Sequence, residues 1–303
     1  MARAYLILAG CVFIWALNYI IRQILLQYFS PIFLSAFSLT VVSAVFLIWA
    51  CVRKRMAKPG GRDLLILFLS ATIGLIANQL LLFKGLQHTS ATNASLIFCM
   101  SPLITAGLAA LILREKVTWR MIAGCMIAVI GLLLALNMKG LRFSLGDLIM
   151  LGATFSFSCN LIFARMLSGR LTPFIVTVYS FTLSAVIFDP FVLSLTDIRW
   201  TQPAGIWALA FASVIIGQGI TSAAWNKGME TTGASRASII LNLQPLMTIL
   251  LEFLIFRSPV SVQQILGACL VLAGVLFGTL SKGLFHSKKK RKDGTQIIDL
   301  QEG

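Results

Sequence analysis

The sequence predicts an all-α polytopic membrane protein with ten transmembrane helices arranged as two inverted five-helix repeats. Three observations lead to this fold class. Of the 303 residues, 58% are hydrophobic and only 12% are charged, whereas soluble domains contain about 25% charged residues. Ten apolar runs follow one another along the chain, and part of the first half recurs in the second. A chain of this composition is solvated by lipid.

Each apolar run is close to the length of about 20 residues that crosses the hydrocarbon core as a helix. The runs cover residues 4–26, 31–52, 63–83, 90–113, 120–137, 146–167, 173–195, 203–225, 235–256 and 261–280. None shows the alternation over about ten residues that is typical of a transmembrane barrel strand. Helices are expected because lipid offers no partner to an exposed backbone amide. We expect the first run to be retained as a helix, since no small-residue cleavage site follows it.

The second half of the chain repeats the first. The stretch KGLQHTSATNASLIFCMSP, which ends at Pro102, recurs in the second half as KGMETTGASRASIILNLQP, which ends at Pro245. Eight of its nineteen positions are identical. The two copies of this stretch are 143 residues apart. Upstream of it the offset is 142 residues, so that Asn18 pairs with Asn160. We therefore predict one repeat at residues 1–139 and a second at 140–282, followed by a polybasic tail at 283–303.

The basic residues predict the orientation of the spans. If the N-terminus is cytoplasmic, the inside segments contain 19 of the 25 Lys and Arg residues. The positive-inside rule then places both termini in the cytoplasm, in the cell (cytoplasmic or inner) membrane. Because each repeat has five spans, the second starts from the opposite side of the membrane and is inverted. Inverted pairs are typical of secondary transporters, whose substrate site lies near the midplane where the copies meet.

Three segments carry a family resemblance: FIWALNYI in the first helix, KGLQHTSATNASLIFCMSPLITAGLAALILREKVT, and the glycine-spaced GCMIAVIGLLL after it. In this order they resemble the EamA-type branch of the drug/metabolite transporter superfamily, over residues 4–280. The resemblance implies transport of amino acids or their derivatives, with export common. The chain departs from the family at FSLT, residues 37–40, where many relatives carry an arginine. It also has Ser258 and Pro259 where the first copy has Glu115 and Lys116.

Polar residues inside apolar helices mark the candidate substrate site, because they are costly in hydrocarbon unless they face a cavity or a partner. In the first helix Trp15, Asn18, Tyr19 and Arg22 share one face. Asn18 could instead join two helices, but its recurrence as Asn160 favours substrate binding. The predicted substrate-binding set is Trp15, Asn18, Tyr19, Asn78, Gln79, Ser95, Phe157, Asn160, Gln218, Thr221, Trp225, Asn242 and Gln244.

Four further residues are candidates for gating or coupling: Arg22, Glu252, Pro102 and Pro245. Arg22 and Glu252 lie at similar depths on the predicted outer side. They either form an ion pair or outer gate, or both extend to the lipid headgroups. Each proline removes a helical hydrogen bond, so we expect kinks in the fourth and ninth helices, as hinges or as fixed bends.

The predicted function is a secondary transporter of small organic metabolites that exports amino acids or related compounds by alternating access. A facilitative uniporter or channel for neutral solutes is the alternative, and a membrane-embedded enzyme is the least favoured class because HExxH, GxSxG and Walker motifs are missing. We expect no catalytic residue, metal or cofactor. The expected partners are the substrate, the bilayer and the proton as a candidate coupling ion, in a monomer or loose homodimer. The net charge of +15 reflects membrane flanks, not nucleic-acid binding.

Overall fold

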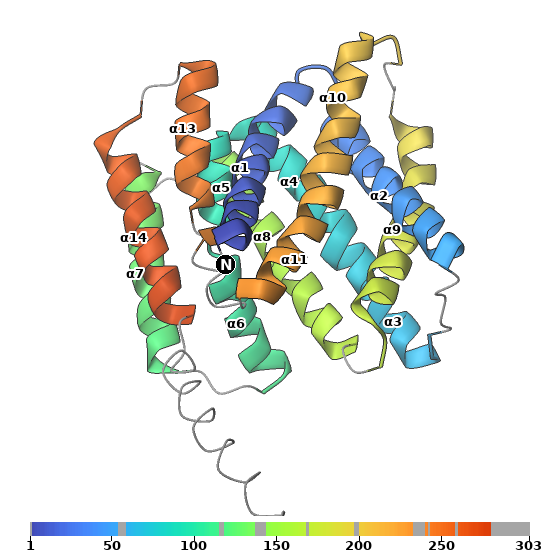
Figure 1. Ribbon diagram of the computed structural model, residues 1–303, viewed down its shortest axis with the longest axis horizontal. Coiled ribbons are helices and arrows are strands. Elements are labelled where there is room, and N and C mark those ends of the chain that lie inside the picture. The colour runs from blue at the N-terminus through green and yellow to red at the C-terminus, as the bar shows by residue number, and fades with distance from the viewer. Residues whose placement is uncertain are drawn as a thin grey trace, which may run out of the picture.

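The computed structural model describes residues 2–53, 59–114, 118–136, 144–167, 170–196, 200–232, 240–241, 243–257 and 260–279. The regular elements in these ranges are helices (Figure 1). In chain order they are α1 (Ala2–Leu25), α2 (Pro31–Arg53), α3 (Gly61–Leu69), η1 (Ser70–Ile76), α4 (Ala77–His88), α5 (Ala91–Phe98), α6 (Ser101–Ile112), α7 (Trp119–Ala135), α8 (Leu145–Leu167), α9 (Pro173–Leu195), α10 (Ala204–Val214), η2 (Ile215–Ile220), α11 (Thr221–Thr232), α13 (Gln244–Phe256) and α14 (Val262–Thr279).

The chain is a multi-pass membrane protein. Among the described residues, six helices are long and apolar enough to cross a membrane: Arg3–Leu25, Pro31–Val52, Gly61–His88, Ala91–Ile112, Leu145–Leu167 and Pro173–Ser194. These match the first four predicted runs and the sixth and seventh. Shorter apolar helices occupy the other four runs, at Trp119–Ala135, Ala204–Ile220, Gln244–Phe256 and Val262–Gly278. Because these are shorter than a full span of about 20 residues, the count of ten spans stays a prediction.

Local sequence signals explain where several helices begin. The Ser90 hydroxyl accepts a hydrogen bond from the Asn93 amide at the start of α5, and the Thr172 hydroxyl accepts one from the Ile175 amide at the start of α9. Serine and threonine are favoured at this position because the first amides of a helix have no partner within it. Pro173 follows as the first residue of α9, where its missing amide hydrogen costs nothing.

Two arginines close equivalent helices in the two halves. Arg114, just after α6, has a φ of 55°, and Arg257, just after α13, has a φ of 56°. Both are in the left-handed region, which residues other than glycine seldom adopt. The offset between them along the chain is the same as that between Pro102 and Pro245 in the sequence repeat. The same unusual backbone turn therefore occurs at the same place in each copy.

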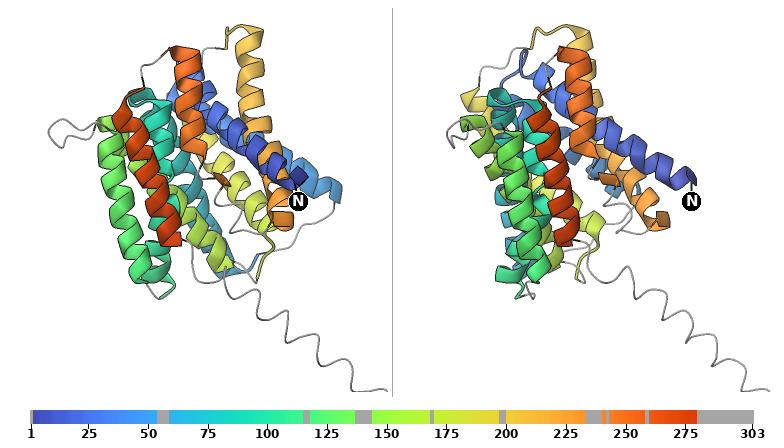
Figure 2. Two further views of the ribbon diagram at one scale, coloured as in Figure 1. Left: turned by 60° about the vertical axis from the view of Figure 1, so that its left-hand side comes forward. Right: turned by 90° about the vertical axis from the view of Figure 1, so that its left-hand side faces the viewer.

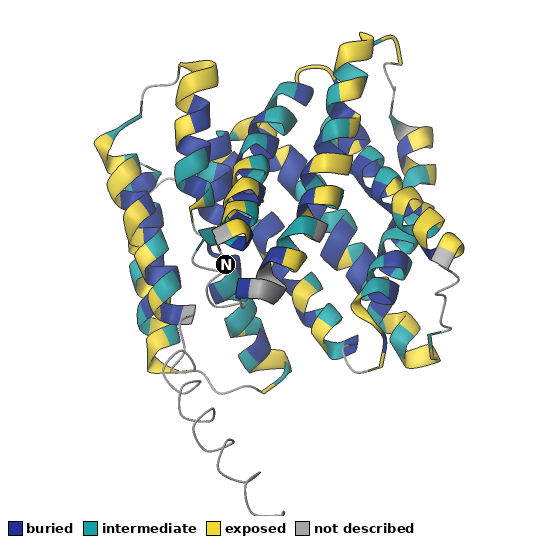
Figure 3. Cartoon of the chain, in the orientation of Figure 1, coloured by how far each residue is buried: buried dark blue, intermediate teal, exposed yellow. Residues whose placement is uncertain are grey.

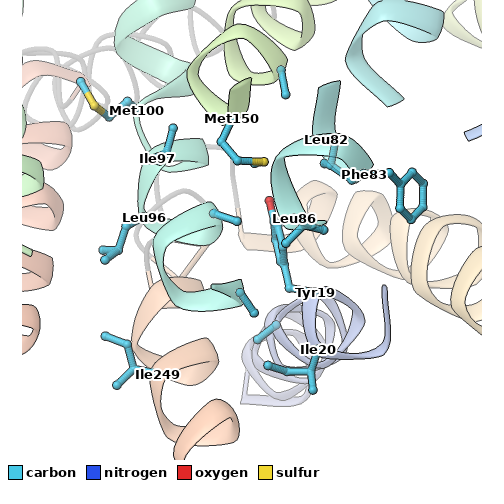
Figure 4. Packing of buried hydrophobic residues seen from close by; sticks show 14 of the residues in the cluster. Tyr19, Ile20, Leu82, Phe83, Leu86, Leu96, Ile97, Met100, Met150 and Ile249 are labelled. Atoms are coloured by element: carbon cyan, nitrogen blue, oxygen red, sulfur yellow. The ribbon is translucent and has the colours of Figure 1, made fainter. Parts of the chain in front are cut away.

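The first long helix of each half packs against the other half. α1 contacts α10, α11 and α13, all from the second half, while α8 contacts α4, α5 and α6 from the first (Figure 1). The central hydrophobic core is shared between the halves, since it combines α1, α4 and α5 of the first half with α8 and α13 of the second (Figure 4). It includes Tyr19, Phe83, Ile97, Met150 and Ile249. Each half thus completes the core of the other.

α7 and α14 lie side by side at one edge of the bundle (Figure 2). Glycines make this approach possible. A methyl group on Gly124 would lie 2.5 Å from the carbonyl oxygen of Gly274, and one on Gly131 would lie 2.5 Å from the amide nitrogen of Val271. Small residues let membrane helices pack closely in this way. The outer faces of the pair are exposed and apolar, as contact with lipid requires (Figure 3), and include Ile122, Met126, Ile130, Val262 and Leu266.

Irregular backbone interrupts the helices at matching places in the two halves. The π-helical segment η1 lies between α3 and α4, and η2 lies between α10 and α11. The fourth predicted span consists of two helical segments, because α5 ends at Phe98 and α6 begins at Ser101, with Cys99 and Met100 between them still in the right-handed helical region. Pro102 and Pro245 lie in the first turns of α6 and α13, where proline takes no hydrogen bond from the helix. The interruption lies directly before Pro102, where the sequence predicts a kink, and the role of this kink as a hinge or a fixed bend stays a prediction.

Candidate functional site

Asn18 of α1 joins the first half of the chain to the second. Its side-chain oxygen accepts a hydrogen bond of 2.5 Å from the Ser213 hydroxyl on α10, and its side chain is only 5% exposed. The amide group packs directly against Gly217 of η2, where a methyl group on the glycine would collide with the Asn18 side chain. A buried amide oxygen without a donor would be costly, so the serine stabilises this packing.

Asn160 of α8 makes the equivalent contact from the second half to the first, and we call these two asparagine contacts the joints between the halves. Its side-chain oxygen accepts a hydrogen bond of 2.6 Å from the Ser70 hydroxyl of η1, and the Ser180 hydroxyl on α9 donates to Ser70 at 3.1 Å. A methyl group on Gly74 would lie 2.7 Å from the Asn160 side-chain oxygen. Both asparagines therefore use the same arrangement: a serine donor and, one helical turn after it, a glycine that leaves room for the amide.

The equivalence of the two joints follows the sequence repeat. Asn160 is the repeat counterpart of Asn18, and Ser213 is the counterpart of Ser70. A second reciprocal pair lies close to the first. The Asn78 amide donates to the Ala153 carbonyl oxygen at 2.8 Å, and the Cys11 thiol approaches the carbonyl oxygen of Thr221 at 3.5 Å. Positions 78 and 221 are again counterparts in the repeat, as are positions 11 and 153.

Two predicted glutamine ligands carry buried polar atoms that are free to bind. Within the described residues, the side-chain oxygen of Gln79 on α4 and the side-chain nitrogen of Gln218 on η2 have no hydrogen-bond partner. Gln79 is only 7% exposed. A buried amide group that lacks a partner costs about 1–3 kcal/mol, so a solute that supplied one would be bound in part by removing that cost.

Aromatic residues from the predicted set form contacts between the halves. The rings of Trp15 on α1 and Trp225 on α11 have centroids 5.1 Å apart. Phe157 on α8 packs against Phe98 on α5, with centroids 4.8 Å apart. Tyr19 differs from these, because it is buried in the hydrophobic core among Leu82, Leu86 and Met150 (Figure 4). The tryptophan pair offers flat surfaces for an organic solute.

Arg22 and Glu252 are both in the described chain, and no ion pair joins them. The Glu252 carboxylate, which is 8% exposed, accepts a 2.7 Å hydrogen bond from the Thr92 amide in the first turn of α5. A helix N-terminus is a favourable place for a carboxylate. The Arg22 guanidinium lies 5.4 Å from the centre of the Phe83 ring, and its Nε is buried without a partner. In this conformation Glu252 is bonded to α5 and not to Arg22, so the outer gate stays a prediction.

The remaining predicted residues lie around the helix break and in α13. The Ser95 hydroxyl donates to the Thr92 carbonyl oxygen within α5 at 2.8 Å. The Thr221 hydroxyl donates to the Ile216 carbonyl oxygen at 2.6 Å, and this oxygen also accepts from the Thr221 backbone amide at the end of η2. Gln244 is the first residue of α13, and it is half-buried. Asn242 lies outside the described residues.

Sequence reasoning missed the serines and the π-helical segments. Ser70 and Ser213 are the donors that hold the two asparagines, and each lies within or just before a π-helical segment. Such segments occur frequently at functional sites. A signal was present, since the two serines are identical residues at equivalent positions of the repeat. Sequence reasoning also passed over Asp189, a carboxylate in the apolar part of α9.

Comparison with known proteins supports one family for the whole chain. The EamA-like transporter family matches residues 2–137 and again residues 144–280. The uncharacterized transporter YyaM of Bacillus subtilis is 30% identical, over 90% of this chain and 92% of its own. A probable amino-acid metabolite efflux pump of Salmonella typhimurium is 26% identical, over 87% of this chain and 90% of its own. A probable terminal-alkyne amino-acid exporter of Streptantibioticus cattleyicolor is 24% identical, over 91% and 93%.

One solved crystal structure has the same fold. It superposes with a TM-score of 0.65 at 17% sequence identity, and the match covers 96% of this chain and 99% of the other. At this identity the likeness concerns the fold alone. The arrangement of helices is thus one that an experimentally solved protein adopts over its full length.

Proposed function

The chain belongs to the EamA-like transporter family, and from this premise we propose that it is a secondary transporter that moves small organic metabolites by alternating access. Amino acids or related compounds are the proposed solutes, and export is the proposed direction. Two relatives support this choice, since one is named as a probable amino-acid exporter and another as a probable amino-acid metabolite efflux pump. The cell membrane is the proposed location, with both termini in the cytoplasm.

The proposed architecture has ten spans in two inverted repeats, at residues 1–139 and 140–282, with a basic tail at 283–303. The observation that carries it is the reciprocal pair of joints. Asn18 is held by Ser213, and Asn160 is held by Ser70, with oxygen–oxygen distances of 2.5 and 2.6 Å. Two joints of equal geometry are what two similar halves facing opposite ways would form. Halves of similar structure can exchange conformations, so that one site opens to each side in turn.

In this proposal the site residues divide into two groups. Asn18, Asn160 and Asn78 already use side-chain atoms for contacts between helices, so they shape the site and join its walls. Gln79 and Gln218 have unpaired buried atoms, and we assign them to the solute. The other proposed contributors are Trp15, Tyr19, Ser95, Phe157, Thr221, Trp225, Asn242 and Gln244. An amide oxygen suits an ammonium group and an amide nitrogen suits a carboxylate, which fits an amino acid.

The proposed gates lie at the helix termini around α5, α6 and α13. Glu252 ties α13 to the start of α5 through the Thr92 amide, so the two helices would have to move together or break a charge-assisted bond. Pro102 and Pro245 stand at the starts of α6 and α13, where irregular backbone permits a change of direction. Arg22 is proposed to take part because its buried Nε is available to an incoming group.

Counterflow tests this function. Purified protein in liposomes preloaded with unlabelled amino acids should take up a pool of radiolabelled amino acids transiently and saturably. Gln79→Ala and Gln218→Ala should each raise the half-saturation concentration by about tenfold, because a hydrogen bond to a polar solute is worth about 1–3 kcal/mol when buried. Gln27→Ala is the matched control, since Gln27 is exposed after α1. Flux that rises linearly with concentration and shows no counterflow would indicate a channel instead of a carrier. Unchanged kinetics in both variants would show that the solute binds elsewhere.

A further inference from the structure

Asp189 is a membrane-embedded carboxyl group that the proposed site does not use. It lies in α9, within the apolar span Pro173–Ser194. Because α9 ends at Leu195, Asp189 is about 9 Å from the end of the helix at about 1.5 Å per residue. An ionised carboxylate at such depth costs a few kcal/mol unless it is paired or hydrated, and residues of this kind usually mark ion or proton pathways.

A threonine on the neighbouring helix holds this carboxyl group. α2 and α9 pack together along one side of the bundle (Figure 1). The Thr40 hydroxyl oxygen on α2 is 2.7 Å from one carboxyl oxygen of Asp189. The same hydroxyl oxygen is 2.9 Å from the carbonyl oxygen of Ala36. The second carboxyl oxygen of Asp189 is buried and has no partner among the described residues.

These two distances fit an Asp189 that carries a proton. A threonine hydroxyl has one hydrogen to donate, yet Thr40 faces two oxygens that accept when Asp189 is ionised. That one hydrogen would then be shared between two acceptors. If Asp189 is protonated, its hydroxyl donates to Thr40, and Thr40 donates to Ala36. In this form each contact has a hydrogen of its own.

Among the described residues packed around α9, none forms an ion pair with Asp189. The packed neighbours of α9 are α2, α3, η1 and α8. Their charged residues are Arg53 at the end of α2, Arg62 and Asp63 on α3, and Asp147 and Arg165 on α8. The other titratable residues are Cys51 on α2, Cys159 on α8 and Tyr179 on α9 itself. Asp63 pairs with Arg170 at 3.0 Å, and Asp147 accepts from Thr89 and Ser144. Within the described chain, the hydrogen-bond partner of Asp189 is Thr40.

The carboxyl group is present in one repeat only. At the offset that pairs Asn18 with Asn160, the counterpart of Asp189 is Leu47, whereas Thr40 itself corresponds to Thr182. Thr182 accepts a 3.3 Å hydrogen bond from Ser43, so the second threonine is paired with a neutral hydroxyl. The α2–α9 contact therefore has two hydroxyl positions but a single titratable group. A group of this kind makes the two ends of the bundle chemically different.

We propose that Asp189 is the proton-binding residue through which this transporter couples solute movement to the proton gradient. The inference rests on the proposed transport function. In the conformation seen here the proton bridges Asp189 and Thr40. When α2 and α9 separate and water enters, the acid gives its proton to water and leaves a hydrated carboxylate, which takes up a proton from the opposite side in the alternate conformation.

Chemical labelling tests the proton without any solute. N,N′-Dicyclohexylcarbodiimide is an apolar reagent that takes the proton of a carboxylic acid onto its nitrogen while the carboxylate adds to its central carbon. Asp189 should be modified in wild-type protein near neutral pH, at a rate that falls as pH rises, and Asp189→Asn should abolish modification of that peptide in mass spectrometry. Asp63, ionised in its pair with Arg170, is the internal control. Wild-type protein in which Asp189 stays unmodified at low and neutral pH would overturn the proposal.

Transport in liposomes tests the coupling. With radiolabelled pooled amino acids, wild-type protein should accumulate solute against a pH gradient, up to about tenfold per pH unit for one proton per solute. Asp189→Asn should lose this accumulation and keep counterflow within about twofold, because exchange moves no net proton. Asp63→Asn is the matched carboxyl control and should retain both. Accumulation by Asp189→Asn, or accumulation that follows a sodium gradient instead, would refute the coupling role. Absence of counterflow in wild type would refute the transport function, and labelling would still decide whether Asp189 holds a proton.

Discussion

At the scale of single residues, the most informative feature is the pairing of each asparagine with a serine and a glycine. Asn160 fits only because Gly74 has no side chain, and Asn18 fits only because Gly217 has none. The amide oxygens are then satisfied by Ser70 and Ser213. Steric fit and hydrogen bonding thus act on the same side chain, so that a small change in either would alter the packing between the halves.

Gly74→Ala should destabilise the protein by about 1–3 kcal/mol, because the added methyl would lie 2.7 Å from the Asn160 side-chain oxygen and force the helices apart. Thermal unfolding in detergent would measure the loss. Gly107→Ala on α6 is the matched control, since a methyl there meets nothing within 4 Å. It should be neutral or stabilising by about 0.5–1 kcal/mol. Equal melting temperatures for the two variants would contradict the tight fit at Gly74.

At the scale of helices, the notable feature is how broken helices are supported. α5 has only eight residues and is too short to be stable alone. Its start is held by Ser90 from its own chain and by Glu252 from α13. The first amides of any helix lack internal partners, and a carboxylate satisfies one of them while interacting favourably with the positive end of the helix dipole. Glu252 therefore has a structural role that hydropathy does not reveal.

Glu252→Ala should lower the free energy of unfolding by about 1–3 kcal/mol, because the buried Thr92 amide would lose its acceptor. Glu252→Gln keeps an oxygen in place and should cost about 1 kcal/mol or less. The pair of variants separates the hydrogen bond from the charge. Asp63→Asn, in a partly exposed ion pair, provides a control expected to change stability by about 0–1 kcal/mol. An alanine variant as stable as the wild type would argue against this capping role.

At the scale of the whole molecule, each half packs its first long helix against the other half. α1 contacts α10, α11 and α13, whereas α8 contacts α4, α5 and α6. The halves cannot separate without exposing the shared core. Motion would instead have to be a rocking of one half against the other about the two asparagine joints, while α7 and α14 remain together through their glycines. We propose this division into moving and fixed helices as the mechanical basis of alternating access.

Reporter fusions can test the inverted topology. Alkaline phosphatase joined after residue 139 should be active, because five spans would carry that point to the outer side of the membrane. Fusion in the basic segment near residue 58, or after residue 282, should be inactive, while green fluorescent protein should fluoresce at both. Activity of phosphatase at residues 58 and 139 alike would contradict the odd number of spans in the first repeat.

The membrane class and the duplication could be predicted because both are properties of the sequence along one dimension. Composition decides whether water or lipid surrounds the chain, and repeated residues such as Asn18 and Asn160 remain visible at a nearly constant offset. The six long spans were predicted for the same reason. The exact ends of α5 and α6 were not, since Pro102 can either kink a helix or begin one, and only the neighbouring backbone decides which.

Sequence alone determined that this protein is helical and lies in a membrane, because lipid offers the backbone no partners and the apolar runs lack the alternation of barrel strands. It also determined that the chain consists of two related halves, because the repeat is visible in the residues themselves. Only the tertiary structure decided which polar groups are occupied and which are available. Asn18 meets a serine 195 residues away, and Asp189 meets a threonine 149 residues away. Such contacts depend on how helices cross, and a polar side chain in an apolar run looks the same in the sequence whether it binds a neighbour, a proton or a solute.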